Sequence, residues 1–385
     1  MTTNLTIESA KTELNNWLQT LLDKNGSILH LKNNSPIKVR IQNKLQTISK
    51  KPVNSETLKT ILKILLVNNL KALMEDKEYE GIYKLDNIHR FKFRIYTHQN
   101  GFAIVFKALP SKIKTFKELH LPNSLEKIID LEQGLVIIAG DDSSGKSTLL
   151  ASIINSINKK HNVHIITIED HIEYIYNEEL STIEQKEIKT HTLGASKAIK
   201  SIIKEDPDII AIDKVADTEV ARHILDLISR GYLVIITLNA LNTKDTISKF
   251  LDFFDYTQKE HARHTLAYML KAIILQELVL SKNKELLPVV EIMYQTDNTK
   301  EIILHSQEEQ LKTVIERDSS LYDSITFEQS LHKLYTAGQI TKDIIYNKQQ
   351  NTTTSSKLST IKELSREEAI SSFEDPISYT IKYDQ

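Results

Sequence analysis

The sequence of 385 residues lacks cysteine and is poor in glycine and proline, of which it has 9 and 7. The absence of cysteine excludes disulfide bonds, thiolate zinc sites and thiol nucleophiles. A net charge of −2, from 49 basic and 51 acidic residues, argues against a general attraction to nucleic acid or anionic lipid. No run approaches the ~18 apolar residues that a membrane span needs, and the N-terminus has no signal-peptide run. We therefore expect a soluble, cytoplasmic protein that could still dock on a membrane complex.

The first hundred residues mix helical and strand patterns. Apolar residues at three-to-four spacing predict helices over 8–23 and 56–76. Alternating apolar runs predict strands around Leu29 and Val39 and after Arg90. Together these patterns indicate an α+β domain.

A different pattern begins at Gly134. The runs LVIIA, HIITI, IIAID and VIITL are short, continuous and apolar, and amphipathic segments separate them. This is typical of a parallel sheet that is covered on both faces. Helical patterns then dominate to about Tyr346, and a polar, low-complexity stretch follows. The predicted organisation is an N-terminal α+β domain at 1–107, a proline-containing linker at 108–122, an α/β domain at 123–300, a helical region at 301–346 and a flexible polar tail at 347–385.

One loop carries the clearest chemical signal. Residues 140–147 match G-x-x-x-x-G-K-[ST] between a predicted strand and a predicted helix, which is the context that this motif requires. Backbone N–H groups and the helix N-terminus would receive the β-phosphate, Lys146 would neutralise β- and γ-phosphate oxygens, and Ser147 would bind Mg²⁺. We therefore predict ATP and Mg²⁺ as ligands. The predicted nucleotide-binding residues of the loop are Gly140, Ser144, Gly145, Lys146, Ser147 and Thr148.

Three residues inside the loop are unusual for a phosphate-binding segment. Asp141 and Asp142 lie in its first half, where side chains usually point away from the phosphates. At ~8 Å and an effective dielectric of ~20, each carboxylate costs roughly 2 kcal/mol against one phosphate charge, before screening. Ser143 costs about 1 kcal/mol more if the loop needs a positive φ there. These terms weaken nucleotide binding without abolishing it.

Further segments accompany the loop in a fixed order. They read IITIEDHIEY (165–174), HTLGASKAIKSIIKEDPDIIAID (191–213), GYLVIITL (231–238) and ITFEQSLHKLYTAGQIT (325–341). Together with the loop they resemble the type IV pilus retraction ATPases of the PilT/PilU type, in the secretion-ATPase branch of RecA-like motors. The resemblance covers roughly Leu14 to Tyr346. The long polar tail is more similar to the PilU kind than to the PilT kind.

The resemblance implies a fold and an assembly. It implies a PAS-like N-terminal domain joined to a RecA-like P-loop NTPase domain, with nucleotide held between the two. It also implies a ring of six copies in the cytoplasm, peripheral to the inner membrane at the pilus base. There the ring would act on an inner-membrane pilus platform protein and drive twitching motility through pilus retraction. Many pilus extension and type II secretion ATPases of the same superfamily carry a four-cysteine metal site, which this chain cannot form.

Two motifs of the family are altered. Its second nucleotide motif is an apolar strand that ends in Gly-Glu, and here Asp213 and Lys214 occupy those two positions. A lysine, with a reference pKa of ~10.4, cannot accept a proton at pH 7. Asp213 could instead act as the acid and as a Mg²⁺ ligand, because other phosphate-loop enzymes end this strand with Asp. Asn239 replaces the family's histidine, and an asparagine can donate a hydrogen bond but cannot titrate.

Other family positions are partly kept. Glu169 remains as the first residue of an acidic segment, although His171 replaces a proline within it. The alternative is that this acidic turn only caps a helix. Arg90 matches a family arginine, so we assign it to the nucleotide. Family arginines are replaced at Lys186, Thr190, Ala216 and Glu277.

Three functions therefore stay open. The replacement of the family's glutamate, histidine and arginines favours an ATP-binding ring subunit with impaired hydrolysis. This subunit would form a homo-hexamer or co-assemble with an active paralogue. The first alternative is a fully active retraction ATPase that uses Glu169 and Asp213 as catalytic residues. The second is a pilus extension or type II secretion ATPase.

Overall fold

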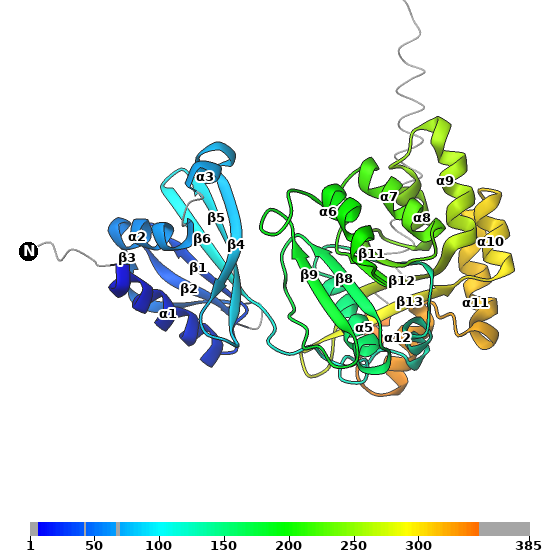
Figure 1. Cartoon of the computed structure of the whole chain (residues 1–385). Helices are drawn as coiled ribbons and strands as arrows, with labels where there is room; N and C mark the ends of the chain where they lie inside the picture. The colour runs from blue at the N-terminus through cyan, green and yellow to red at the C-terminus, as the bar shows by residue number, and fades with distance from the viewer. Residues whose placement is uncertain (1–6, 42–43, 67–69, 346–385) are drawn as a thin grey trace, which may run out of the picture.

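The chain forms two α/β parts, which Figure 1 shows side by side. A computed structural model describes residues 7–41, 44–66 and 70–345, so the predicted tail at 347–385 lies outside the described residues. A six-stranded sheet belongs to the N-terminal part and a seven-stranded sheet to the C-terminal part. The predicted α/β class with a smaller α+β part at the N-terminus is confirmed.

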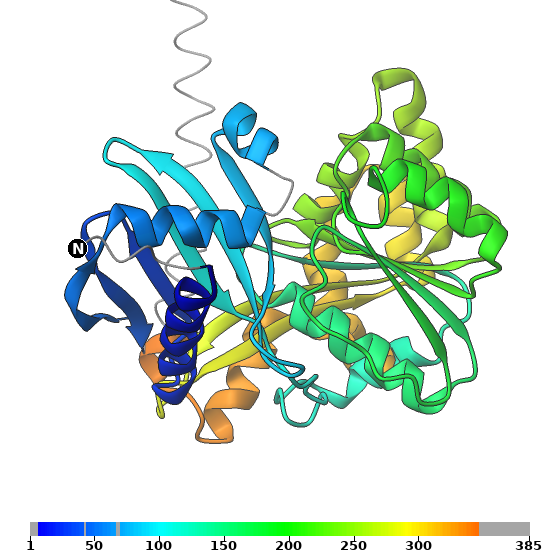
Figure 2. The same ribbon diagram turned by 60° about the vertical axis from the view of Figure 1, so that its left-hand side comes forward.

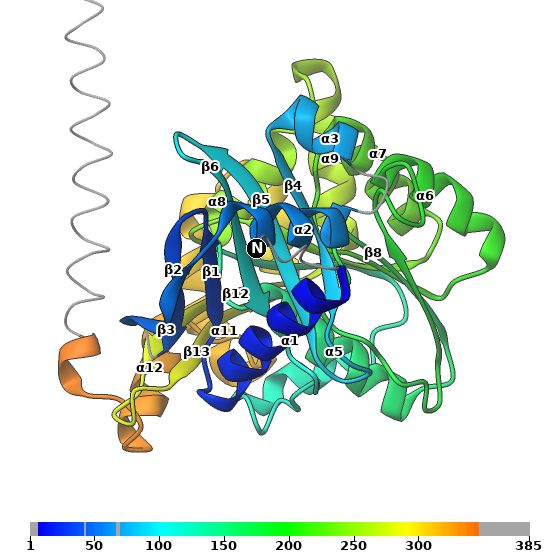
Figure 3. The ribbon, with the colours of Figure 1, turned by 90° about the vertical axis from the view of Figure 1, so that its left-hand side faces the viewer.

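The N-terminal sheet is antiparallel, with the strand order β3-β2-β1-β6-β5-β4. Its strands are β1 (Ile28–Lys32), β2 (Ser35–Ile41), β3 (Lys44–Val53), β4 (Glu78–Lys84), β5 (Arg90–His98) and β6 (Gly101–Ala108). The helices are α1 (Ile7–Asp23), α2 (Ser55–Leu66) and α3 (Leu70–Asp76). Figure 3 looks onto α1 and α2, which cover one face of the sheet and share its core through Leu14, Leu18 and Ile61. The sequence did not predict β3 and β4, because most of their side chains are not buried and so show no apolar alternation.

The C-terminal sheet has the order β13-β12-β7-β11-β10-β8-β9 and is parallel except for β13. Its strands are β7 (Gly134–Gly140), β8 (His164–Glu169), β9 (Thr182–Glu187), β10 (Ile209–Ile212), β11 (Leu233–Asn239), β12 (Leu270–Leu280) and β13 (Leu286–Tyr294). The helices are α4 (Glu126–Ile129), α5 (Lys146–Lys160), α6 (Ala195–Ile202), α7 (Thr218–Ser229), α8 (Thr243–Leu251), α9 (Tyr256–Met269), α10 (Asp297–Leu304), α11 (Leu311–Tyr322) and α12 (Phe327–Thr336). No helix in these described ranges is both long and apolar enough to cross a lipid bilayer.

Both faces of the C-terminal sheet are buried. Along β7, Leu135 and Ile137 join a core with α6 to α11, whereas Val136 and Ile138 join a second core with α4 and α5. Figures 1 and 2 show these two layers of helices on opposite sides of the sheet. The continuous apolar runs that predicted this parallel sheet are thus explained by burial on both faces.

The expectation that helices dominate from the end of β11 to Tyr346 is wrong for residues 270–294. This segment forms β12, which pairs in parallel with β7, and β13, which pairs antiparallel with β12. The run KAIILQELVL is apolar at seven of its ten positions, so its periodicity does not distinguish a buried strand from a buried helix. The segment forms a strand because it lies beside β7 and its backbone pairs with that strand.

Asn158 fixes the connection between β8 and β9. Its side chain is fully buried near the end of α5. The amide Nδ2 donates to the carbonyl of Asn177 at 2.7 Å, and Oδ1 accepts from the backbone N–H groups of Glu179 at 3.0 Å and Ser181 at 3.3 Å. One side chain therefore holds the segment that follows the acidic residues of the site.

We expect Asn158→Ala to lower the free energy of unfolding by about 2–3 kcal/mol, because buried backbone groups lose their partner. The measurement is urea unfolding followed by far-ultraviolet circular dichroism. Asn162→Ala, at an exposed position two residues beyond α5, serves as the control and should change stability by less than about 0.5 kcal/mol. Equal losses in the two variants would show that Asn158 has no special role.

Candidate active site

The predicted site residues gather at one edge of the C-terminal sheet. Gly140 pairs with Asn239 at the ends of β7 and β11, and Ile212 pairs with Ile168 just before Asp213 and Glu169. Parallel strands end at the same edge, and ligands of open α/β sheets bind there. The fold therefore brings the phosphate loop, the acidic segment and the altered motifs together.

The loop between β7 and α5 has the backbone that its sequence requires. Gly140 has φ 153°, Ser143 has φ 64° and Gly145 has φ 95°. The expected positive φ at Ser143 is confirmed, so this serine carries backbone strain. A Cβ at Gly145 would lie 2.4 Å from Gln276 Nε2, and one at Gly140 would lie 2.4 Å from the Gln276 carbonyl oxygen. Only glycine fits at both positions.

Gln276 is a supporting residue that the sequence did not reveal. It lies on β12 and is buried, and its Nε2 donates to the carbonyl of Ser144 at 2.8 Å. A cavity of about 290 Å³ lies beside it, lined by the first half of the loop and by Leu241 and Phe327. No local pattern marks Gln276, because its role depends on the pairing of β12 with β7.

Lys146 is half-buried at the start of α5. Its ammonium donates to the carbonyls of Gly140 at 3.0 Å and Asp141 at 2.8 Å. Burial lowers the pKa of Lys146, and the charges of Asp142, Asp213 and Asp141 oppose this change. Ser147 follows in the first turn, and the first N–H groups of a helix have no acceptor within it. A lysine, a serine and N–H groups without helical acceptors thus share the first turn of α5.

Thr148 also lies in the first turn of α5. Its hydroxyl is 2.8 Å from the hydroxyl of Tyr174. Tyr174 follows the acidic segment in sequence and is buried. This contact joins α5 to the acidic segment.

The carboxylates of Glu169 and Asp213 are largely shielded from water. Burial raises the pKa of Glu169 to about 7, although its Oε1 accepts from Thr167 at 2.6 Å and Gln185 at 2.9 Å. Burial, together with the charges of Glu173 and Asp170, raises the pKa of Asp213 to about 6. Both groups can therefore exchange protons near neutral pH.

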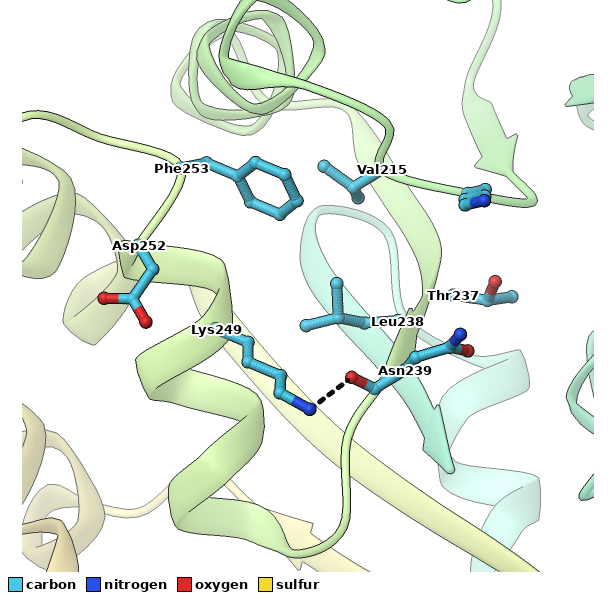
Figure 4. A pocket seen from close by; sticks show the side chains of 8 residues that line it. Val215, Thr237, Leu238, Asn239, Lys249, Asp252 and Phe253 are labelled. Atoms are coloured by element: carbon cyan, nitrogen blue, oxygen red, sulfur yellow. Dashed lines mark hydrogen bonds between the residues drawn. The ribbon is translucent and has the colours of Figure 1, made fainter. Parts of the chain in front are cut away.

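Asp213 and Lys214 lie in different surroundings. The Asp213 backbone N–H donates to the carbonyl of Ile168 at 2.9 Å, and its carbonyl accepts from the Thr237 hydroxyl. Its carboxylate is near enough to Lys146 for the two charges to interact. Lys214 is exposed and lines a cavity of about 260 Å³, whose other walls include Val215, Thr237, Asn239 and Phe253. Figure 4 shows this cavity, with Lys249 donating to the carbonyl of Asn239 at 3.1 Å.

Asn239 contacts the phosphate loop. Its side-chain Nδ2 donates to Asp142 Oδ1 at 2.8 Å, across 97 residues of sequence. The neighbouring Asp141 carboxylate instead accepts from the backbone N–H of Asp142 at 2.8 Å. The two loop aspartates therefore have different partners.

Arg90 contacts the acidic segment in this structure. Its guanidinium donates to the carbonyls of Ile172 and Glu173, at 2.7 Å each, and it is buried. His171, in the same segment, lies 3.4 Å from Glu80 of β4 and 4.0 Å from Glu187 of β9. The N-terminal sheet is thus bound directly to the acidic segment of the site.

Two of the positions where family arginines are replaced, Lys186 and Thr190, make local contacts, and His191 lies close to them in sequence. The ammonium of Lys186 pairs with Glu205 at 2.6 Å, and the Thr190 hydroxyl donates to Glu187 at 2.8 Å. His191 is exposed and accepts from the Glu187 backbone N–H at 3.0 Å.

The chain is similar to known proteins over most of its length. The family model of type II/IV secretion system proteins matches residues 7–376. The type IV pilus ATPase PilU of Pseudomonas aeruginosa is 30% identical over 331 residues, which cover 86% of each chain. The retraction ATPase PilT of the same organism is 29% identical over 319 residues, which cover 83% of this chain and 92% of that protein. The resemblance to the PilT/PilU type is confirmed.

A solved structure shows the same likeness in the fold. The crystal structure of the pilus retraction motor PilT with bound ADP has a TM-score of 0.77 and 27% identity to this chain. The match covers 86% of this chain and 95% of that chain. This match supports the predicted order of the domains, in which an N-terminal domain precedes a RecA-like domain in the chain.

The raised pKa of Glu169 makes stability depend on pH. The folded state binds this proton more tightly than the unfolded chain does, so stability falls as pH rises from about 4.5 to about 7. We expect Glu169→Gln to be more stable than the wild type by about 1–3 kcal/mol at pH 8, with the difference shrinking at pH 5. Urea unfolding at the two pH values measures this.

The control for this experiment is Glu132→Gln, at an exposed position before β7. Its stability should stay within about 0.5 kcal/mol of the wild type at both pH values. A loss of stability in Glu169→Gln that is the same at pH 8 and pH 5 would contradict the expectation.

Proposed function

The chain belongs to the family of type II/IV secretion system proteins, and we propose that it is an ATP-binding motor-type subunit of a type IV pilus machine, associated with pilus retraction and twitching motility. Its similarity to the pilus ATPases PilU and PilT supports this function. The observation that carries it is the geometry of the loop, in which only glycine fits at Gly140 and Gly145 and Lys146 begins α5. The Asp213 carboxylate is close enough to Lys146 for the two charges to interact.

The residues at this edge fit a nucleotide with Mg²⁺. The two glycines let the loop pack against Gln276, where a Cβ would clash, and this packing would hold the backbone N–H groups of the loop in place for phosphate oxygens. Ser147 and Asp213 are the residues that would hold Mg²⁺, which supplies positive charge against that of the phosphoryl group. Ser144, Gly145 and Thr148 would line the phosphates. Arg90 would act on the nucleotide from the N-terminal sheet.

We infer that hydrolysis is impaired. Lys214 offers no carboxylate to accept a proton from water, and its surroundings differ from those of Asp213. Loss of a general base typically costs 10²–10⁴-fold in rate, and loss of an arginine finger 10³–10⁵-fold. One observation favours the alternative of an active motor, because a carboxyl group with a pKa of about 7, such as Glu169, can serve as a base. In that case Glu169 and Asp213 would carry the reaction.

We also infer the assembly. The subunit would form a ring of six, made of this chain alone or mixed with an active paralogue. It would act in the cytoplasm, peripheral to the inner membrane, and would bind an inner-membrane platform protein at the pilus base. Similarity to pilus ATPases over most of the chain supports this assembly.

Nucleotide binding tests the proposed function. Lys146→Ala removes an ammonium that would bind phosphate oxygens, so we expect at least tenfold weaker binding of a fluorescent ATP analogue in the presence of Mg²⁺. Lys159→Ala, at the other end of α5, removes the same charge from an exposed position and should leave affinity within about twofold. Equal affinity of the wild type and Lys146→Ala would refute a phosphate-binding role for the loop.

Turnover tests the inference on hydrolysis. We expect the wild type to bind ATP but to release phosphate slowly. Lys214→Glu combined with Asn239→His should raise the rate at least tenfold, because both repairs act mainly on the transition state. Adding Glu169→Gln should abolish the gain.

A different result would favour the active motor. If the wild type hydrolyses ATP rapidly and Lys214→Ala changes nothing, hydrolysis is not impaired. The variant Asp213→Asn would then test whether Asp213 supplies the catalytic carboxyl group. If it does, this variant should lose the phosphate release that is measured in the wild type.

A further inference from the structure

The contact between Asp142 and Asn239 places a carboxylate inside the proposed nucleotide site. Asn239 Nδ2 donates to Asp142 Oδ1 at 2.8 Å. Asn239 ends β11 and is the register partner of Gly140, the first residue of the loop. The contact therefore links the loop to the end of β11, the strand that lies between β7 and β10.

In the proposed nucleotide site, the third phosphate of a triphosphate would lie beyond the start of α5, within reach of Lys146 and close to this contact. The lysine of a phosphate loop reaches the β- and γ-phosphates. Among the charges that act on Lys146, that of Asp142 comes first and that of Asp213 second. Asp142 and Asp213 are therefore both close enough to Lys146 for their charges to act on it, and Asn239 binds the first of them.

We propose that Asp142, held in place by Asn239, makes this site selective for nucleoside diphosphates over nucleoside triphosphates. The proposal rests on the proposed function, since it concerns the same nucleotide site. A diphosphate ends in the cradle of N–H groups at the start of α5, and Lys146 neutralises it there. A triphosphate brings a further anionic group toward the Asp142 carboxylate and competes with that carboxylate for the Asn239 donor.

The charge balance at this position favours the shorter ligand. Three aspartates of the site act on the single ammonium of Lys146, namely Asp141, Asp142 and Asp213. A negative charge ~4 Å from a phosphate weakens its binding by roughly fivefold in bulk water, and by more at the lower effective dielectric near a protein surface. Of these three, Asp142 is the aspartate whose carboxylate accepts a hydrogen bond from Asn239 at the end of β11. The carboxylate would lose this hydrogen bond if it moved away from the proposed phosphate site.

The two loop aspartates offer a matched pair of variants. Asp142→Asn removes the charge that Asn239 holds, while Asp141→Asn removes the same charge from the adjacent residue, which has no bond to Asn239. Both side chains are exposed, so neither change should disturb folding, and circular dichroism verifies this. Asn239→Ala frees the Asp142 carboxylate without changing the charge of the chain.

The experiment is calorimetric titration of the full chain with ADP and with the non-hydrolysable β,γ-imido analogue of ATP, both with Mg²⁺. We expect the wild type to bind ADP at least tenfold more tightly than the analogue. Asp142→Asn should shift this ratio at least tenfold toward the triphosphate, and Asn239→Ala should shift it in the same direction. Asp141→Asn should shift it less than threefold.

The outcomes separate this proposal from the proposed function. Binding of neither nucleotide would overturn both. Binding of both nucleotides with equal affinity would overturn the selectivity alone. So would an Asp141→Asn variant that shifts the ratio as far as Asp142→Asn does, because the effect would then belong to the net charge of the loop.

Discussion

The hydrogen-bonded register of the adjacent parallel strands β8, β10, β11 and β7 is the constraint on which the site depends. Each strand contributes its carboxyl end to the same edge, so the residue after one strand lies beside the residue after the next. Glu169, Asp213, Asn239 and Gly140 become neighbours in this way. The register itself is fixed by burial, because apolar side chains of these strands fill a core on each face.

The chemistry of this edge is dominated by negative charge. Carboxylates from the phosphate loop, the acidic segment and the end of β10 lie close enough to influence one another and Lys146. Shielding from water raises the pKa of Glu169 and Asp213 into the neutral range, while Lys146 and Lys92 oppose this for Asp213.

The N-terminal sheet takes part in this site through its contacts with the acidic segment. Arg90 binds two backbone carbonyls of the segment, and His171 lies between Glu80 and Glu187. A proline at position 171 would offer no side-chain partner to either carboxylate. The substitution thus adds a polar contact between the two sheets next to Glu169.

The sequence by itself determined the four parallel strands β7, β8, β10 and β11, the phosphate loop and the family. These depend on patterns within short segments, such as continuous apolar runs and the spacing of Gly140, Gly145 and Lys146. Only the tertiary structure decided that residues 270–294 form strands, that Gln276 supports the loop, and that Asn239 holds Asp142. Each of these depends on contacts between residues far apart in the chain, which leave no local pattern.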